Sequence, residues 1–223
     1  MSSIRRTALV TGVLFLVTEV AAIAGLLLYG PALKDAGYVL GAGADARVFA
    51  GALCEIVLVL AVIGTGIVLF PVVKRCNEGA ALGYVCGRLL EGAVIALGII
   101  AVLSVVTLRR EAPGGEVATV ARALVAVHDW TFLLGPNFVL GANTLVLAVL
   151  MYRSRLVPRF IAVLGLVGGP LICASAVAVL FGVYGQVSPL GSLAAVPVFA
   201  WEVTLAVRLI VKGFDHVARL PAA

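Results

Sequence analysis

Six apolar stretches run through this chain, at residues 8–29, 48–73, 80–108, 125–151, 160–184 and 190–211. An α-helix rises about 1.5 Å per residue, so about 20 apolar residues suffice to cross the roughly 30 Å hydrocarbon core of a bilayer. None of the stretches alternates apolar and polar residues as a membrane β-strand does. The pattern therefore predicts an all-α polytopic membrane protein, a six-transmembrane-helix bundle.

The composition excludes a water-soluble globular protein. Hydrophobic residues make up 63% of the chain and charged residues 12%, which is about half the charged share of soluble domains. The six spans and their short connections use up the 223 residues, so we expect a single membrane domain over residues 1–223. Glu19 interrupts the first stretch, which favours an uncleaved first span over a signal peptide.

The basic residues predict the orientation. Lys and Arg are more frequent near the N-terminus, in the turns at 74–78 and 153–159 and in the C-terminal tail than in the opposite loops. By the positive-inside rule, both termini are expected to be cytoplasmic, in a multi-pass protein of the cytoplasmic (inner) membrane. The net charge of +5 then indicates contact with the lipid bilayer and its anionic headgroups rather than nucleic-acid binding.

Few residues are available for metal or cofactor chemistry. The four cysteines form no C-x-x-C pair, and the chain has only two histidines, too few for a three-histidine metal site. No serine-nucleophile elbow, zinc-protease motif or phosphate-binding loop is present. We therefore predict no metal and no cofactor, and we expect a protein that is not an enzyme.

Charged and amide side chains inside the spans are the strongest functional signal, because a charge in lipid costs several kcal/mol and marks a functional site by default. Measured along each helix at about 1.5 Å per residue, five such residues come out roughly 12 to 18 Å from the cytoplasmic side. They are Glu19, Arg88, Glu91, Asn143 and Glu202. We predict that they converge near mid-membrane, where the excess of carboxylates needs a proton, a cation or water.

A second polar group is expected nearer the outer face. It consists of Glu55, His128, Asp129, Trp130 and Asn137. His128 beside Asp129 is suited to titrate near neutral pH, and Trp130 is also typical of an interface anchor.

Small residues recur at the spacing that allows helices to approach closely. Gly79, Gly83 and Gly87 form one row, and Gly165 and Gly169 form a shorter one. We expect these rows to pack helices within one chain or between two chains.

Several segments together resemble a known family. They are Gly83-Tyr84 with Arg88–Glu91, Asp129-Trp130 with Phe132–Pro136, Tyr152–Arg159, Gly168–Pro170, Trp201-Glu202 and Ile210–Phe214. The chain is similar over nearly its whole length to the bacterial membrane family called domain of unknown function 4386. The resemblance implies a small bacterial integral membrane protein and carries no activity to this chain.

Three functions remain open at this point. The leading hypothesis is binding or translocation of a small solute, proton or cation at the mid-membrane carboxylate/Arg cluster, with six spans favouring a homodimer. One alternative is an intramembrane enzyme acting on a lipid-like substrate, with His128, Asp129 and Glu55 as acid–base groups. The other is a structural or regulatory subunit of a membrane complex, in which the buried charges only hold helices together.

Overall fold

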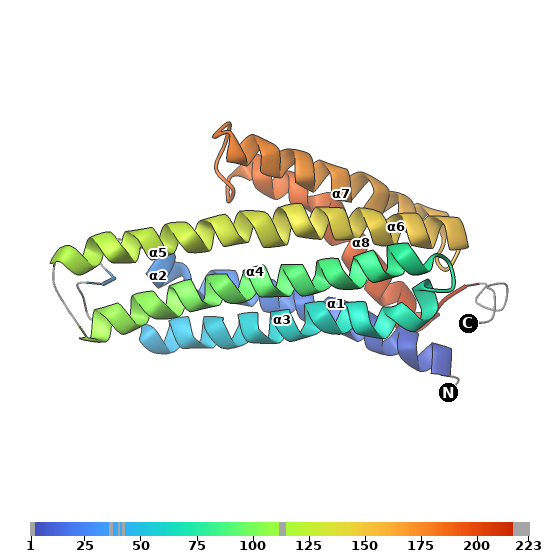
Figure 1. The fold of residues 1–223 in the computed structure, drawn as a ribbon, viewed down its shortest axis with the longest axis horizontal. Helices are drawn as coiled ribbons and strands as arrows, with labels where there is room; N and C mark the ends of the chain where they lie inside the picture. Colours follow the sequence, from blue (N-terminus) through green and yellow to red (C-terminus); the bar gives the residue numbers. More distant parts are fainter. Residues whose placement is uncertain (1–2, 36–37, 40, 42, 112–114, 216–223) are drawn as a thin grey trace.

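The computed structural model describes residues 3–35, 38–39, 41, 43–111 and 115–215, and all its regular elements there are helices (Figure 1). Six helical segments in this part of the chain are long and apolar enough to cross a membrane. They are Ser3–Leu28, Asp45–Val73, Glu78–Glu111, Val117–Ser154, Arg159–Leu180 and Pro189–Val211. The predicted all-α six-span bundle is confirmed, and the chain is a multi-pass membrane protein.

The spans follow one another as hairpins. Helix α1 (Ser3–Leu28) and the short α2 (Gly30–Lys34) precede the hairpin of α3 (Asp45–Val73) and α4 (Glu78–Glu111). The fourth span is built from α5 (Gly115–Leu133), the π-helical segment η1 (Leu134–Val139) and α6 (Leu140–Ser154). Helices α7 (Arg159–Leu180) and α8 (Pro189–Val211) form the last hairpin. Most predicted span ends agree within a few residues, but α5 begins ten residues, or nearly three helical turns, before the apolar stretch that starts at residue 125.

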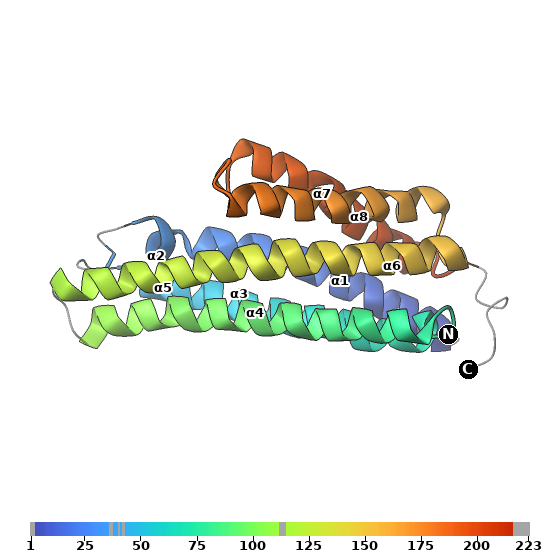
Figure 2. The same cartoon turned by 45° about the horizontal axis from the view of Figure 1, so that its top comes forward.

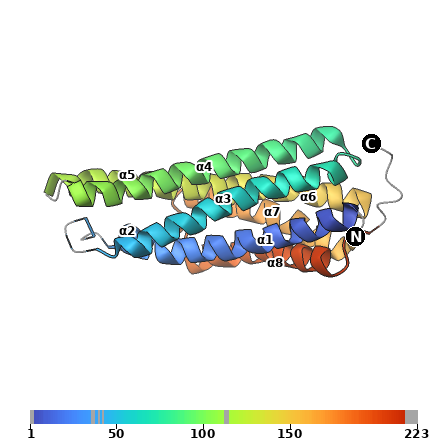
Figure 3. The same cartoon turned by 90° about the horizontal axis from the view of Figure 1, so that it is seen from below.

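Helix α1 begins and α8 ends at the same end of the bundle, called here the terminal end (Figures 1 and 3). The opposite end, called the distal end, carries the last residues of α4 and the first residues of α5, with α2 beside them. At the terminal end the Arg5 guanidinium donates to the carbonyl oxygens of Leu209, at 2.7 Å, and Ile210, at 2.5 Å. These bonds join the first helix to the last. That this end faces the cytoplasm stays a prediction from the basic residues.

A cluster of ion pairs holds the distal end together. The Asp45 carboxylate, at the start of α3, accepts bonds from Arg109 and, at 2.8 Å, from Arg110, both at the end of α4. The Tyr38 hydroxyl donates to the same carboxylate at 2.7 Å. Burial, with this hydrogen bond, raises the pKa of Tyr38 to about 12, so the hydroxyl remains a neutral donor at ordinary pH.

Buried apolar side chains form two clusters along the bundle. The one toward the terminal end includes Phe15, Leu69, Tyr84, Trp201 and Leu205. The one toward the distal end includes Tyr29, Val48, Val62, Ile95 and Val102. In α4 and α8 the buried charged residues, and in α1 the half-buried Glu19, fall between or beside the positions that enter these clusters. The apolar core is thus interrupted by polar side chains near the middle of the bundle.

The helices are unequal in length, which leaves the distal half thinly packed. Figures 1 and 2 show α7 and α8 ending well short of the far ends of α4 and α5. Helix α8 packs mainly against α1 and α7, whereas α5 packs mainly against α4 and η1. In the distal half, α5 therefore has little contact with α1 or α8.

The predicted glycine rows differ in what surrounds them. A methyl group added at Gly165 would lie 2.8 Å from both the Ala148 methyl carbon and the Trp201 ring, and one at Gly169 would lie 2.7 Å from a backbone oxygen of α6. A methyl group at Gly87 would overlap the Asn143 amide, whereas one at Gly83 meets nothing within 4 Å and one at Gly79 meets only Asn77. Close helix approach within the chain therefore depends on Gly87, Gly165 and Gly169.

We predict that Gly165→Ala lowers the thermal unfolding midpoint in detergent, because the added methyl group overpacks a core contact at a cost of about 1–3 kcal/mol. Gly185→Ala is the control and should leave the midpoint unchanged, since a methyl group added there meets no atom within 4 Å. Circular dichroism of the helical signal on heating measures both variants. Equal midpoints for the two would contradict the packing assigned to Gly165.

Candidate functional site

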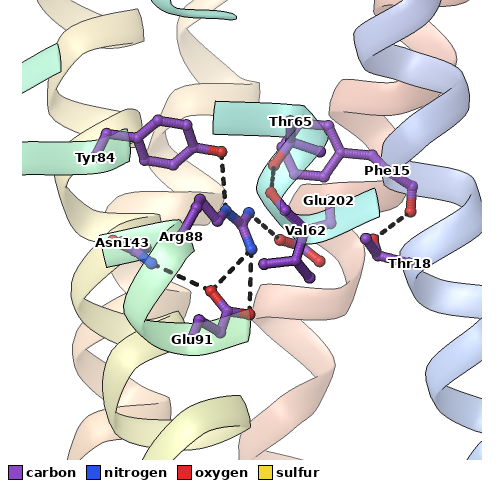
Figure 4. A network of polar contacts seen from close by, with 9 residues as sticks. All are labelled: Phe15, Thr18, Val62, Thr65, Tyr84, Arg88, Glu91, Asn143 and Glu202. Atoms are coloured by element: carbon purple, nitrogen blue, oxygen red, sulfur yellow. Dashed lines mark hydrogen bonds and ion pairs between the residues drawn. The ribbon is translucent and has the colours of Figure 1, made fainter. Parts of the chain in front are cut away.

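Arg88 is the centre of a buried polar network drawn from four helices (Figure 4). Its guanidinium donates to Glu91, one turn along α4, at 3.1 Å, and to Glu202 of α8 at 3.0 Å. Asn143 of α6 donates to the same Glu91 carboxylate at 3.1 Å. One ion pair lies within α4, and the other joins α4 to α8. The Asn143 hydrogen bond joins α6 to the same group in the bundle interior.

The rest of the guanidinium is enclosed by aromatic rings. Nε donates to the Tyr84 hydroxyl at 3.0 Å, and the guanidinium carbon lies 5.4 Å from the centre of that ring and 5.5 Å from the ring of Phe15. Arg88 is only 2% exposed. All three nitrogens are thus engaged, which is what a buried cation requires if its desolvation is to be offset.

Glu19 joins the network from α1 without contacting a cation. Its carboxyl group lies within hydrogen-bonding reach of the Glu202 carboxyl group, and Arg88 acts on it only at longer range. Two carboxyl groups in contact repel one another unless a proton or a cation lies between them. The structure therefore brings together all five residues of the predicted mid-membrane group, and no cationic side chain among the described residues forms an ion pair with Glu19.

A cavity of about 210 Å³ lies beside this network. Glu19, Arg88, Glu91 and Glu202 line it together with Glu55 of α3 and His128 of α5. Its other walls are mostly apolar, from Ala22, Leu58, Val62, Ile95, Phe132, Pro136, Leu140, Ala195, Val198 and Phe199. Two residues of the predicted outer group thus share one cavity with the mid-membrane group.

Glu55 is the least compensated of these carboxyl groups. It is 8% exposed, and among the described residues no hydrogen bond or ion pair is made by its side chain. His128 and Tyr29 are titratable groups that interact with it electrostatically. The His128 ring packs edge-on to Tyr29, at 5.8 Å between ring centres, and is stacked on Phe132 at 6.3 Å. The Glu55 carboxyl group is therefore buried without a hydrogen-bonding or ionic partner among the described residues, and it lines the cavity.

Two glycines make room for this side of the cavity. A methyl group at Gly25 of α1 would lie 2.8 Å from the Glu55 side chain, and one at Gly98 of α4 would lie 2.7 Å from Thr131 Oγ1, one turn from His128. These glycines allow α1 to approach α3 and α4 to approach α5. Neither stands in a repeated row, so the spacing of small residues gave no signal for them.

The remaining members of the predicted outer group do not enter the cavity. Asp129 Oδ1 lies 3.4 Å from His128 Nδ1, but the Asp129 side chain is 66% exposed, and Trp130 is about half exposed. Both face a second hollow toward the distal end. Asn137 donates instead to the backbone carbonyl of Phe132 at 3.1 Å.

That backbone bond explains the shape of η1. Proline has no N–H, and its ring displaces the carbonyl four residues earlier, which for Pro136 is the carbonyl of Phe132. Asn137 satisfies the carbonyl that Pro136 releases, and the chain widens into π-helix at Leu134–Val139. Such segments are frequent at functional sites, and here Pro136 itself forms part of the cavity wall.

We predict that Arg88→Met destabilises the protein severely, because it leaves Glu91 and Glu202 buried without a cation. Breaking a buried ion pair costs about 3–5 kcal/mol. Adding Glu91→Gln and Glu202→Gln to Arg88→Met should restore most of the thermal midpoint measured in detergent. A single Arg88→Met variant as stable as the unsubstituted protein would show that the network does not hold these helices.

Comparison with known proteins identifies the family of the chain. No curated protein and no solved structure shows a significant match to this chain. The family model described as a domain of unknown function (DUF4386) matches residues 10–213, which include most of the first span, the other five spans and every residue of the cavity. The chain therefore belongs to the DUF4386 family of membrane proteins.

Proposed function

We propose that the cavity binds a small organic cation, or an amine that is protonated when bound, and that this binding is one step in moving the solute through the membrane domain. Glu55 carries the proposal. A carboxyl group in a membrane interior needs a partner, and Glu55 is buried against a hollow without one. Glu19, with only another carboxyl group in reach, adds a second point of attraction.

The charge balance favours a cation over a neutral or anionic solute. Four carboxyl groups line the cavity, from Glu19, Glu55, Glu91 and Glu202. Arg88 compensates Glu91 and Glu202 through direct ion pairs. No guanidinium or ammonium group of the described residues contacts the other two. A positively charged ligand would supply the missing counter-charge, and an anion would meet further repulsion.

The walls favour an organic cation over a metal ion. Ca²⁺ takes six to eight oxygen ligands and Mg²⁺ is octahedral, but no cluster of three or more His, Cys, Asp or Glu within the described residues is arranged to hold a metal. The walls are instead mainly aliphatic and aromatic, with Phe132 and Phe199 among them. Aromatic faces attract alkylated ammonium groups, so apolar substituents on the cation would be accommodated.

Helix association explains some of the charged side chains at the cavity but not Glu55. Polar contacts between membrane helices contribute about 0.6 kcal/mol on average, and Arg88, Glu91, Asn143 and Glu202 form such contacts. Glu55 contacts no helix through a hydrogen bond, so helix association gives no reason for a carboxyl group at this position. Ligand binding gives one.

We predict that tetramethylammonium binds to the protein in lipid nanodiscs and that Glu55→Gln weakens this binding at least tenfold, because it removes the uncompensated charge. Glu78→Gln is the matched control: the same substitution on an exposed residue at the start of α4, outside the cavity. Equilibrium dialysis with radiolabelled tetramethylammonium measures both. Binding that is absent, or equal in the two variants, would refute the proposed function.

The predicted homodimer also remains a proposal, and one face of α4 supports it. Gly79, Gly83, Cys86 and Leu90 are all exposed along this face, and no side chain of the described chain covers Gly83. Rows of small residues let the backbones of two helices approach closely in membranes. A second copy packed on this face would bring the two Cys86 residues near one another.

Oxidative cross-linking of the native cysteines tests the dimer. Cysteines form a disulfide only when their Cα atoms approach within about 7 Å, so we expect mild oxidation of membranes to give a covalent dimer that is lost in Cys86→Ser. Cys173→Ser, at a partly buried cysteine of α7, should leave the dimer unchanged. A monomer under both conditions would argue against this interface.

A further inference from the structure

We infer that the ligand is a single-chain amphiphile with a cationic head: the head occupies the cavity, and the chain leaves it beside the stacked rings of His128 and Phe132, into a second hollow. This inference rests on the proposed function, because it assigns the cation to the same site and adds what is attached to it.

The second hollow, called here the vestibule, has a volume of about 950 Å³ and lies on the distal side of the cavity. Its walls come from the end of α1, from α2, from the start of α3, from the end of α5 and from the end of α7 with the connection to α8. The apolar part of the lining consists of Leu26, Leu27, Leu33, Trp130, Val179 and Val187. These side chains offer an alkyl chain a largely hydrophobic surface.

The cavity and the vestibule are neighbours that share part of their walls. His128 and Phe132 line both, and their rings are stacked one turn apart on α5. Helix α5 makes little contact with α1 and α8. Because the two rings belong to the walls of both hollows, they lie at the boundary between them. A chain attached to a head at Glu55 would pass beside them.

The two hollows differ in charge as an amphiphile requires. Carboxyl groups exceed cations in the cavity. In the vestibule, Lys34 and Arg47 are matched in formal charge by Asp35 and Asp129. The cationic head is therefore attracted to the inner hollow, and the vestibule holds no comparable excess that would retain it there.

The volumes of the two hollows also assign the head group to the cavity and the chain to the vestibule. Pockets for drug-sized ligands usually measure about 300–1,000 Å³. The cavity, at about 210 Å³, is below that range, whereas the vestibule, at about 950 Å³, is near its upper end. A head group alone fills the first, and a complete amphiphile needs both.

The walls of the vestibule extend to the outer surface of the bundle. Leu27, Trp130 and Val187 line it and are all exposed, the first two on membrane-spanning segments and Val187 in the connection between α7 and α8. On the other side of the cavity, Tyr84, Phe15 and Trp201 close the way to the terminal end as members of the buried core. The vestibule is thus the open side, and a chain leaving the cavity lies against apolar walls rather than in water.

A series of alkyltrimethylammonium ions tests the inference. With the protein in nanodiscs, hexyl- and decyltrimethylammonium compete with radiolabelled tetramethylammonium, and affinities are expressed per free aqueous concentration. We expect tighter binding with each added methylene, by up to about fourfold for one that becomes fully buried. Val187→Trp, which fills the vestibule, should remove most of the gain for the decyl compound and leave tetramethylammonium binding unchanged.

Val183→Trp is the matched control, since Val183 is an exposed valine of the same connection between α7 and α8 and does not line the vestibule. It should bind the whole series as the unsubstituted protein does. Decyl sulfate, with the same chain and an anionic head, should not displace tetramethylammonium. If tetramethylammonium binds through Glu55 but chain length has no effect, the inference fails and the proposed function stands. A chain-length gain that Val187→Trp leaves intact would also overturn the inference, because the chain would then lie elsewhere.

Discussion

The ion pairs of Arg88 are the interaction on which the interior of this bundle depends. A guanidinium in the membrane interior is stable only if its nitrogens are bonded and its charge is compensated. Glu91 and Glu202 provide both, and Glu202 lies on α8, at the far end of the sequence from α4. Apolar contacts between lipid-facing helices are nearly interchangeable with contacts to lipid. Lipid cannot replace the ion pairs in this way, so the ion pairs determine which faces of α4 and α8 meet.

The same network separates the two apolar clusters and so creates the space beside it. Close packing fills a core where side chains are apolar and complementary, but paired carboxylates and a guanidinium occupy fixed positions set by hydrogen-bond geometry. Three features widen the remaining space: the short α7–α8 hairpin, the π-helical turn at Pro136, and the limited contact of α5 with α1. The cavity is therefore a consequence of the fold as a whole rather than of a single bulky or missing side chain.

The six spans could be predicted from the sequence because bilayer thickness fixes helix length, and the rise per residue places charges at comparable depths. Depth alone does not say on which side of a helix a residue lies or which helices are neighbours. For this reason Glu55 and His128 were expected as a separate outer group, although they face the same cavity as Glu19 and Glu202. The close approaches at Gly25 and Gly98 that bring them there depend on single contacts between helices, which no periodicity encodes.

The closed side of the cavity limits what the observed arrangement can do. A ligand that enters from the vestibule meets Glu55 and His128 first and then Glu19 with Glu202. Beyond them, Arg88 lies between Tyr84 and Phe15 and blocks the route to the terminal end. Under the proposed function, binding in the cavity leaves the ion pairs of Arg88 in place, whereas transport requires that these ion pairs break or move as a unit. A cation bound at Glu202 would compete with Arg88 for the same carboxylate. Binding of the cation would therefore weaken the Arg88–Glu202 ion pair, which closes the route to the terminal end.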